Sequence, residues 1–264
     1  MTIGYRIQRY FHHPDSHPHA HPHAHDHQGM ANGDVVENKK SGARQIQVVR
    51  RVLDVNEKMA NENRRFFNEK KVFTLNVMSS PGSGKTMTLE RTISMIMEEI
   101  KTAIIVGDIC TTNDADRLAR TGAPVVQINT DEFGGDCHLA AHVIERSAAS
   151  IDLDPIDLLI IENIGNLVCP AEFDIGEDAR VVVLSVTEGE DKPLKYPLMF
   201  RESDIALLNK TDLLPYLDFD IKEAVRNIHQ VHPGMPIFEI SAKTGEGFDP
   251  WIDWIRQQVL NKTF

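Results

Sequence analysis

The chain has 264 residues, 41% of them hydrophobic, which is enough to bury a sizeable core. Its formal net charge of −11 argues against a nucleic-acid or anionic-membrane surface, because both require clustered Lys and Arg. No apolar run approaches the ~20 residues that span a bilayer, and the first residues do not resemble a secretory signal. Three cysteines are too few for a disulfide framework, so we expect a cytoplasmic protein with free thiols.

The composition of residues 1–43 predicts a disordered tail that binds metal. Between residues 11 and 28, histidine alternates with Pro, Ala, Asp and Ser, a composition that cannot form a core. Because imidazole binds nickel well, the histidines predict several weak nickel sites suited to storage or delivery. These candidate ligands are His12, His13, His17, His19, His21, His23, His25 and His27. A solvated linker or an expression tag is the alternative, although a tag is usually an unbroken histidine run.

The pattern of residues 44–70 predicts an amphipathic helix that docks on the domain after it. Apolar residues recur there at helical spacing, with charged residues between them. Across residues 71–264, short apolar runs alternate with helical patterns. The expected strands are 73–78, 103–106, 125–128, 158–161, 181–186, 205–208 and 237–240, and the expected helices include 87–100, 139–149, 221–231 and 250–260. This alternation predicts an α/β fold of the P-loop NTPase type, a mostly parallel sheet with helices on both faces.

A phosphate-binding loop is predicted at residues 79–86, where Ser-Ser-Pro-Gly-Ser-Gly-Lys-Thr joins a strand to a helix. The backbone N–H groups of Gly82, Ser83 and Gly84 can surround phosphate closely, and the helix N-terminus adds positive potential. We expect Lys85 to reach the β- and γ-phosphates and Thr86 to ligate Mg²⁺. Serine stands where this motif usually has its first glycine, which leaves every functional group in place.

Two acids at predicted strand ends complete the expected catalytic set. Asp108 and Glu162 stand where Mg²⁺ or its water shell is usually held, together with Thr86. The N–H of Gly165 can reach the γ-phosphate. Ordinary strand-end acids are the alternative reading. Because no glutamine stands where small GTPases orient their water, we expect slow intrinsic hydrolysis with Lys85, Thr86, Asp108 and Glu162 as the catalytic residues.

Specificity for guanine is predicted by two loops that follow later strands. In the segment Asn-Lys-Thr-Asp, the Asp212 carboxylate can accept hydrogen bonds from N1–H and the exocyclic amine of guanine, a pair that adenine lacks. We expect Lys210 to lie along the ring and Asn209 to tie this loop to the phosphate loop. A second segment, Ser241-Ala242-Lys243, can offer the Ala242 N–H to guanine O6, with Lys243 beside the ring.

A nickel or zinc site is predicted at Cys137, His138 and Cys169, because thiolate and imidazole suit soft and borderline metals. Three ligands per chain are few, so two chains could pool theirs in a homodimer. Buried structural cysteines with an unrelated histidine are the alternative. His142 is a weaker candidate, and Cys110 is expected to be inert. Because Cys169 shares a loop with the segment expected to sense the γ-phosphate, metal affinity should depend on the nucleotide.

From about residue 48 to the C-terminus, these motifs resemble the HypB family of hydrogenase nickel-incorporation GTPases, of the SIMIBI class. The match includes residues 56–64, 79–86, 107–108, 112–115, 137–139, 162–170, 187–192 and 209–212. The resemblance implies a metallochaperone that hydrolyses GTP and dimerises with GTP. It would deliver nickel to the large subunit of [NiFe]-hydrogenase, with HypA as partner. It also implies a metal site at Cys137, His138 and Cys169. Some members begin with a cysteine-rich nickel motif, whereas this chain has no cysteine before Cys110.

Two other functions stay open from the sequence. The first is a urease-type nickel GTPase, a related family that carries Cys-Pro-His in one loop. That motif is missing, because Ala171 follows Cys169-Pro170. The second is a nickel-storage protein in which nucleotide binding is vestigial, and the complete Lys85, Thr86 and Asp212 set speaks against it.

Overall fold

The computed structural model describes residues 38–108, 112–129 and 138–263. The chain divides into two units, Met1–Ala43 and Arg44–Phe264, and the second carries the fold described below. The eight tail histidines, Cys110 and Cys137 lie outside the described residues. Within the described part of the chain, no helix is both long and apolar enough to cross a bilayer.

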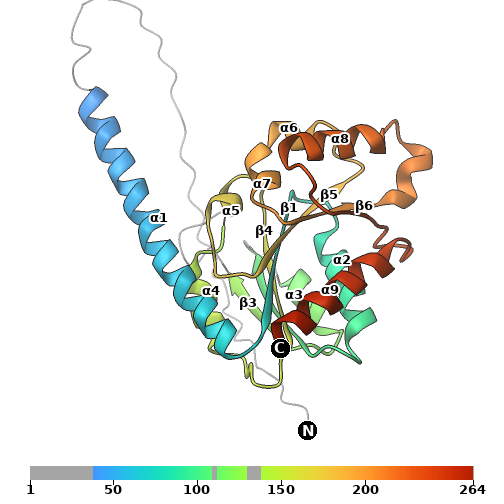
Figure 1. Ribbon diagram of the computed structural model, residues 1–264, viewed down its shortest axis with the longest axis horizontal. Coiled ribbons are helices and arrows are strands. Elements are labelled where there is room, and N and C mark those ends of the chain that lie inside the picture. Colours follow the sequence, from blue (N-terminus) through green and yellow to red (C-terminus); the bar gives the residue numbers. More distant parts are fainter. Residues whose placement is uncertain (1–37, 109–111, 130–137, 264) are drawn as a thin grey trace, which may run out of the picture. The chain divides into compact units, whose positions relative to one another are not determined.

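Seven parallel strands form one sheet in the order β3-β2-β4-β1-β5-β6-β7 (Figure 1). Their bounds are β1 (Phe73–Ser79), β2 (Thr102–Asp108), β3 (Val125–Asn129), β4 (Leu158–Gly165), β5 (Ala179–Ser185), β6 (Ile205–Asn209) and β7 (Ile237–Glu239). Six of the seven β1 residues are apolar or hydroxyl-bearing, and all seven are buried, because β1 is hydrogen-bonded to β4 and β5 and covered on both faces. The predicted α/β fold of a P-loop NTPase is confirmed, and the sheet is wholly parallel among the described strands.

Helices cover both faces of the sheet. One face packs against α2 (Lys85–Ile96), α3 (Asn113–Ala119) and α9 (Phe248–Thr263). The buried Trp251 of α9 belongs to this layer and donates its indole N–H to Thr92 Oγ1 of α2 at 3.0 Å. The opposite face holds two apolar clusters. One includes α1 (Asn38–Glu69) and α4 (Ala141–Ala148), and the other includes α5 (Cys169–Glu172), α7 (Pro197–Arg201) and α8 (Ile221–Val231).

Several elements differ from the expectation. Helix α1 begins at Asn38, before the predicted start at residue 44. The helices α3, α5, α7 and α6 (Lys192–Lys195), and the 3₁₀ helix η2 (Thr211–Tyr216), were not predicted. These elements have four to seven residues, which is too short for a helical period to stand out in the sequence.

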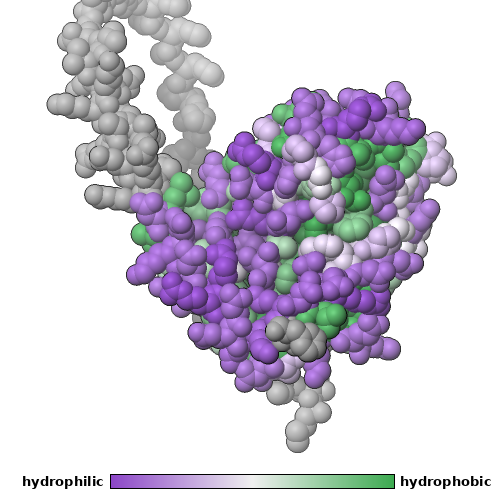
Figure 2. All heavy atoms as spheres, in the orientation of Figure 1, coloured by the Kyte–Doolittle hydropathy of each residue, from purple (hydrophilic) through white to green (hydrophobic). Residues whose placement is uncertain are grey.

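The face of the molecule in Figure 2 is mostly hydrophilic, with hydrophobic residues visible in small areas between polar ones.

Helix α1 docks on the domain through polar side chains as well as through the buried Phe67. Asn63 donates from its amide to the carbonyl of Ala141 at 2.8 Å and to that of Ile175 at 3.0 Å. Gly176 has a φ of +91°, and a Cβ there would lie 2.6 Å from the Ala60 carbonyl oxygen of α1. The close approach of the helix therefore requires glycine at this position.

Candidate functional site

The phosphate loop lies between β1 and α2, at the carboxyl edge of the sheet. Gly82 and Gly84 have φ values of +78° and +92°, the left-handed region that glycine adopts without a steric penalty. A Cβ on Gly84 would lie 2.6 Å from Asn209 Nδ2. Glycine is thus required at position 84 for two reasons. Its φ angle is positive, and it packs closely against Asn209 at the end of β6.

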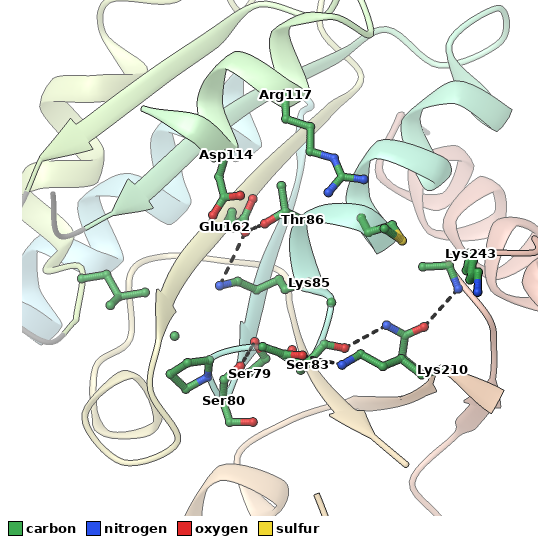
Figure 3. Close-up of a pocket in the computed structure, with 18 of the residues that line it drawn as sticks. Ser79, Ser80, Ser83, Lys85, Thr86, Asp114, Arg117, Glu162, Lys210 and Lys243 are labelled. Atoms are coloured by element: carbon green, nitrogen blue, oxygen red, sulfur yellow. Dashed lines mark hydrogen bonds and ion pairs between the residues drawn. The ribbon is translucent and has the colours of Figure 1, made fainter. Parts of the chain in front are cut away.

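Lys85 and Thr86 both point toward the end of β4 (Figure 3). The Lys85 ammonium donates to the carbonyl of Asn163 at 2.6 Å and lies 3.6 Å from Glu162 Oε1. The Thr86 hydroxyl donates to the same Glu162 oxygen at 2.7 Å. Only one of the three ammonium donors of a lysine is needed for Asn163, so Lys85 can also bind phosphate oxygens.

The carboxylate of Glu162 is nearly inaccessible to solvent, with 1% of the residue exposed. Its Oε2 is buried and has no hydrogen-bond partner among the described residues. Burial raises the pKa of this carboxyl above its usual 4.5, although the positive charge of Lys85 opposes the rise. A hydrated divalent cation would satisfy the remaining oxygen, so Glu162 and Thr86 fit a Mg²⁺ site.

The two base loops meet the phosphate loop through Asn209. Its amide Nδ2 donates to the Ser83 carbonyl at 2.9 Å, and its Oδ1 accepts from the Ala242 N–H at 3.1 Å. The Lys210 ammonium donates to the Gly82 carbonyl at 2.6 Å. Asp212 Oδ1 accepts a hydrogen bond from Ser241 at 2.6 Å. One side chain therefore holds together three loops that lie far apart in the sequence.

These groups line one cavity of about 760 Å³, large enough for a nucleotide. The predicted site residues on its wall are Gly82, Ser83, Gly84, Lys85, Thr86, Asp108, Glu162, Gly165, Asn209, Lys210, Asp212, Ala242 and Lys243. Ser241 supports the wall through its bond to Asp212. The predicted phosphate-binding and base-binding groups therefore line the same cavity.

Sequence reasoning gave no role to two charged residues on the cavity wall, Asp114 and Arg117, or to Glu188 beside the phosphate loop. Asp114 and Arg117 reach that wall from α3, and Arg117 pairs with Glu90 of α2, its Nε lying 2.6 Å from Oε2. Glu188 follows β5 and accepts a hydrogen bond from the Ser80 hydroxyl of the phosphate loop. Its other oxygen accepts from the Ser185 N–H at 3.0 Å. Only the resemblance to the HypB family singles out residues 187–192. No local sequence pattern indicates that Glu188 contacts the phosphate loop.

The described part of the predicted metal site comprises His138 and Cys169. The His138 ring stacks on Phe173, with centroids 3.7 Å apart, and Phe173 directly follows the helix that Cys169 begins. His138 therefore packs on a residue four positions after Cys169. Cys169 is disulfide-bonded in this structure, whereas the sequence predicts a free thiol there. Among the described residues, which do not include Cys137, no three His, Cys, Asp or Glu side chains form a metal-binding group.

Comparison with known proteins agrees with this geometry. Residues 73–239 match the family "CobW/HypB/UreG, nucleotide-binding domain". The hydrogenase maturation factor HypB of Escherichia coli K12 is 49% identical over 218 residues, which cover 83% of this chain and 74% of that protein. The hydrogenase/urease maturation factor HypB of Helicobacter hepaticus is 38% identical over 225 residues, covering 84% of this chain and 89% of the relative.

Solved structures of the same family superpose on the fold. The crystal structure of HypB from Helicobacter pylori in complex with nickel has a TM-score of 0.74 and 35% identity, and the match covers 79% of this chain and 96% of that one. HypB from Archaeoglobus fulgidus has a TM-score of 0.72 and 38% identity, with 78% and 99% covered. The shared fold, the cavity between phosphate and base loops, and the identity over most of both chains show that this chain is a nucleotide-binding protein of the HypB family.

Proposed function

We propose that the protein is a GTP-hydrolysing nickel metallochaperone that delivers nickel during [NiFe]-hydrogenase maturation. The observation that carries the proposal is the position of Cys169, which begins α5 four residues after β4 ends at Gly165. The same strand end carries Glu162, and Gly165 lies so close to the phosphate loop that a Cβ on it would be 3.2 Å from Pro81 Cα. Movement of this segment with the terminal phosphate would move a metal ligand.

Guanine recognition is assigned to Asp212, Lys210 and the Ser241–Lys243 loop. The Ser241 hydroxyl orients the Asp212 carboxylate at the cavity wall, and a carboxylate there favours a base that presents two adjacent donors. GTP is therefore the substrate and GDP the product. The wall offers no described glutamine to orient the attacking water, which supports slow intrinsic hydrolysis.

Mg²⁺ is assigned to Thr86 and Glu162, with Asp108 at the same wall. When bound, this ion would neutralise charge on the phosphates. The protein's own groups hold the phosphates, because Lys85 binds them and the backbone of residues 82–84 encloses them. Asn209 keeps the base and phosphate loops in fixed relation.

Nickel, or zinc, is the proposed cargo at Cys137, His138 and Cys169. Two chains would supply six such ligands, which favours a GTP-dependent homodimer in which the partner copy completes the coordination. The tail histidines would collect nickel loosely. HypA and the hydrogenase large subunit are the proposed partners, by analogy with the family. We retain the domain division of residues 1–43, 44–70 and 71–264 as part of this proposal.

The test is a titration of Ni²⁺ into reduced full-length protein whose eight tail histidines are replaced by asparagine. We expect the affinity to differ by roughly tenfold between GDP and a non-hydrolysable GTP analogue, a coupling of about 1.4 kcal/mol. Cys169→Ala should weaken metal binding and abolish the difference. Equal nickel affinity in both nucleotide states would refute the coupling.

A second candidate is nickel delivery to urease. The Helicobacter hepaticus relative carries both hydrogenase and urease in its name, so a HypB chain can be associated with either enzyme. Pull-down with each apo-enzyme from cells that contain both would separate the two. Binding to the urease apo-enzyme alone would favour the second candidate.

A further inference from the structure

A buried line of polar side chains crosses one face of the sheet between its two apolar clusters. This polar seam comprises Asn76 of β1, Asn163 of β4, Glu177 just before β5, and Arg180 of β5. Asn76, Asn163 and Glu177 are 0%, 1% and 6% exposed. Buried polar groups cost free energy unless they are hydrogen-bonded, so a continuous line of them in a core requires an explanation.

The hydrogen bonds in the seam run in one sequence. Asn163 donates from Nδ2 to Asn76 Oδ1 at 3.2 Å, and Asn76 donates from Nδ2 to Glu177 Oε1 at 3.1 Å. Arg180 Nε also donates to Glu177 Oε1, at 2.5 Å. Asn76 is thus hydrogen-bonded to both Asn163 and Glu177, and it sits in the strand that leads into the phosphate loop.

One end of the seam touches the nucleotide site. The backbone carbonyl of Asn163 accepts the 2.6 Å hydrogen bond from Lys85, which is assigned to the β- and γ-phosphates. The Asn163 side chain also accepts from the Ile164 N–H at 2.9 Å, so its amide sets the backbone direction at this point of β4. Any change in the position of the Lys85 ammonium therefore acts on the residue that begins the seam.

The other end holds the helix α1. Glu177 Oε2 accepts from the Ile175 N–H at 2.8 Å, in the loop 173–176. The same loop anchors α1, because the Asp174 carbonyl accepts from Asn56 at 2.6 Å and the Asp174 carboxylate pairs with Arg64 at 2.8 Å. Phe173, at the start of the loop, stacks on His138.

We propose that Asn76 is a positioning residue that couples the Lys85 end of the nucleotide site to the docking of α1 on the loop 173–176. The proposal rests on the proposed function, because it takes GTP and GDP as the ligands that Lys85 distinguishes. Phosphate bound to the other donors of Lys85 shifts the ammonium relative to the Asn163 carbonyl, and that shift is passed through Asn76 to Glu177 and Ile175. The strength with which helix α1 docks on the loop 173–176 then differs between the GTP-bound and GDP-bound states.

The experiment is hydrogen–deuterium exchange of full-length protein with Mg²⁺ and either GDP or a non-hydrolysable GTP analogue. In the wild type, we expect amides in residues 53–69 to exchange at rates that differ by about threefold or more between the two nucleotides. Asn76→Ala should abolish this difference and lower affinity for the GTP analogue by about threefold more than affinity for GDP. Glu177→Gln should also abolish the difference in exchange rate. Both carboxylate oxygens of Glu177 accept hydrogen bonds, so the amide NH₂ of glutamine would face a group that also donates.

Thr74→Val is the matched control. Thr74 lies on the same strand and the same face as Asn76, is fully buried, and its Oγ1 has no hydrogen-bond partner among the described residues. This variant should keep the wild-type difference in α1, which would exclude a general effect of altering buried β1 side chains. Thermal unfolding of each variant confirms that it folds, and Glu177→Gln serves as the test should Asn76→Ala not fold.

A nucleotide-dependent difference in α1 that persists in both seam variants would overturn the proposal. Identical α1 exchange in the two nucleotide states of the wild type would do the same, provided that calorimetry shows both nucleotides bound. A wild-type chain that binds neither guanine nucleotide in calorimetry would overturn the proposed function as well. The two failures are therefore distinguished by the binding measurement.

Discussion

The hydroxyl of Ser241 donates a hydrogen bond to Oδ1 of Asp212 at 2.6 Å, and this contact joins the loop after β6 to the loop after β7. It holds the carboxylate at the wall of the cavity, in the place assigned to the edge of the guanine ring. Replacing the carboxylate by an amide keeps the shape and changes one acceptor into a donor. The preferred base should change with it.

Asp212→Asn is therefore expected to lower GTP affinity by roughly 100-fold, because two hydrogen bonds to a charged group are lost. Affinity for xanthosine triphosphate should rise, since xanthine presents an oxygen where guanine has its amine. Competition binding with labelled nucleotide measures both. Asp218→Asn, an exposed acid beyond η2, is the control and should bind GTP normally. An Asp212→Asn variant that still prefers GTP would show that the base is recognised elsewhere.

Gly84→Ala should abolish nucleotide binding. The new methyl group would lie 2.6 Å from Asn209 Nδ2 and would also strain a backbone with φ of +92°. Gly82→Ala is the matched control, because φ is +78° but nothing lies within 4 Å of the new Cβ. That variant should cost only about 1 kcal/mol of backbone strain and retain binding. Equal loss of binding in both variants would mean that the contact with Asn209 is unimportant.

Glu188→Gln should weaken nucleotide binding by about tenfold, the scale of one charge-assisted hydrogen bond. The amide can still accept from the Ser185 N–H and donate to the Ser80 hydroxyl, but the charge that strengthens the contact with the phosphate loop and the ion pair with Lys192 at 3.6 Å is lost. Isothermal titration with GDP provides the measurement. Asp191→Asn, which removes an exposed ion pair with Lys195, should leave affinity unchanged.

Glu162→Gln should stabilise the nucleotide-free, metal-free protein at neutral pH. Burial raises the pKa of Glu162, so the folded state binds the proton more tightly than the unfolded state, and the carboxylate costs stability once pH exceeds the unfolded value near 4.5. The midpoint temperature of the variant should exceed that of the wild type by about 2 °C or more at pH 7. The gain should shrink as pH falls and Glu162 becomes protonated. A gain independent of pH would contradict this cause.

The phosphate and base loops could be read from the sequence because each is a contiguous motif placed directly after a buried strand. Lys85, Asn209 and Asp212 follow from that rule, and the structure places all three at one cavity. The seven strands were also predictable, since each is a short apolar run. Local pattern and local structure coincide in these segments.

Glu188 and the polar seam could not be read in this way. Glu188 contacts Ser80 because β5 lies beside β1, a neighbour relation that depends on the strand order of the whole sheet. Asn76 and Glu177 are 101 positions apart, and neither belongs to a motif with a known chemical role. Asp114 and Arg117 lie on a seven-residue helix that has no detectable period. Pairings of this kind become visible only in three dimensions.

The double contact of Asn209 sets the time at which a newly made chain can first hold its nucleotide. This side chain meets Ser83, 126 positions earlier, and Ala242, 33 positions later. Synthesis proceeds from the N-terminus, so the phosphate loop leaves the ribosome long before the residues that lock it to the base loops. Nascent chains that end before β7 should lack a complete pocket, and acquisition of nucleotide would then mark the moment at which the whole sheet has formed.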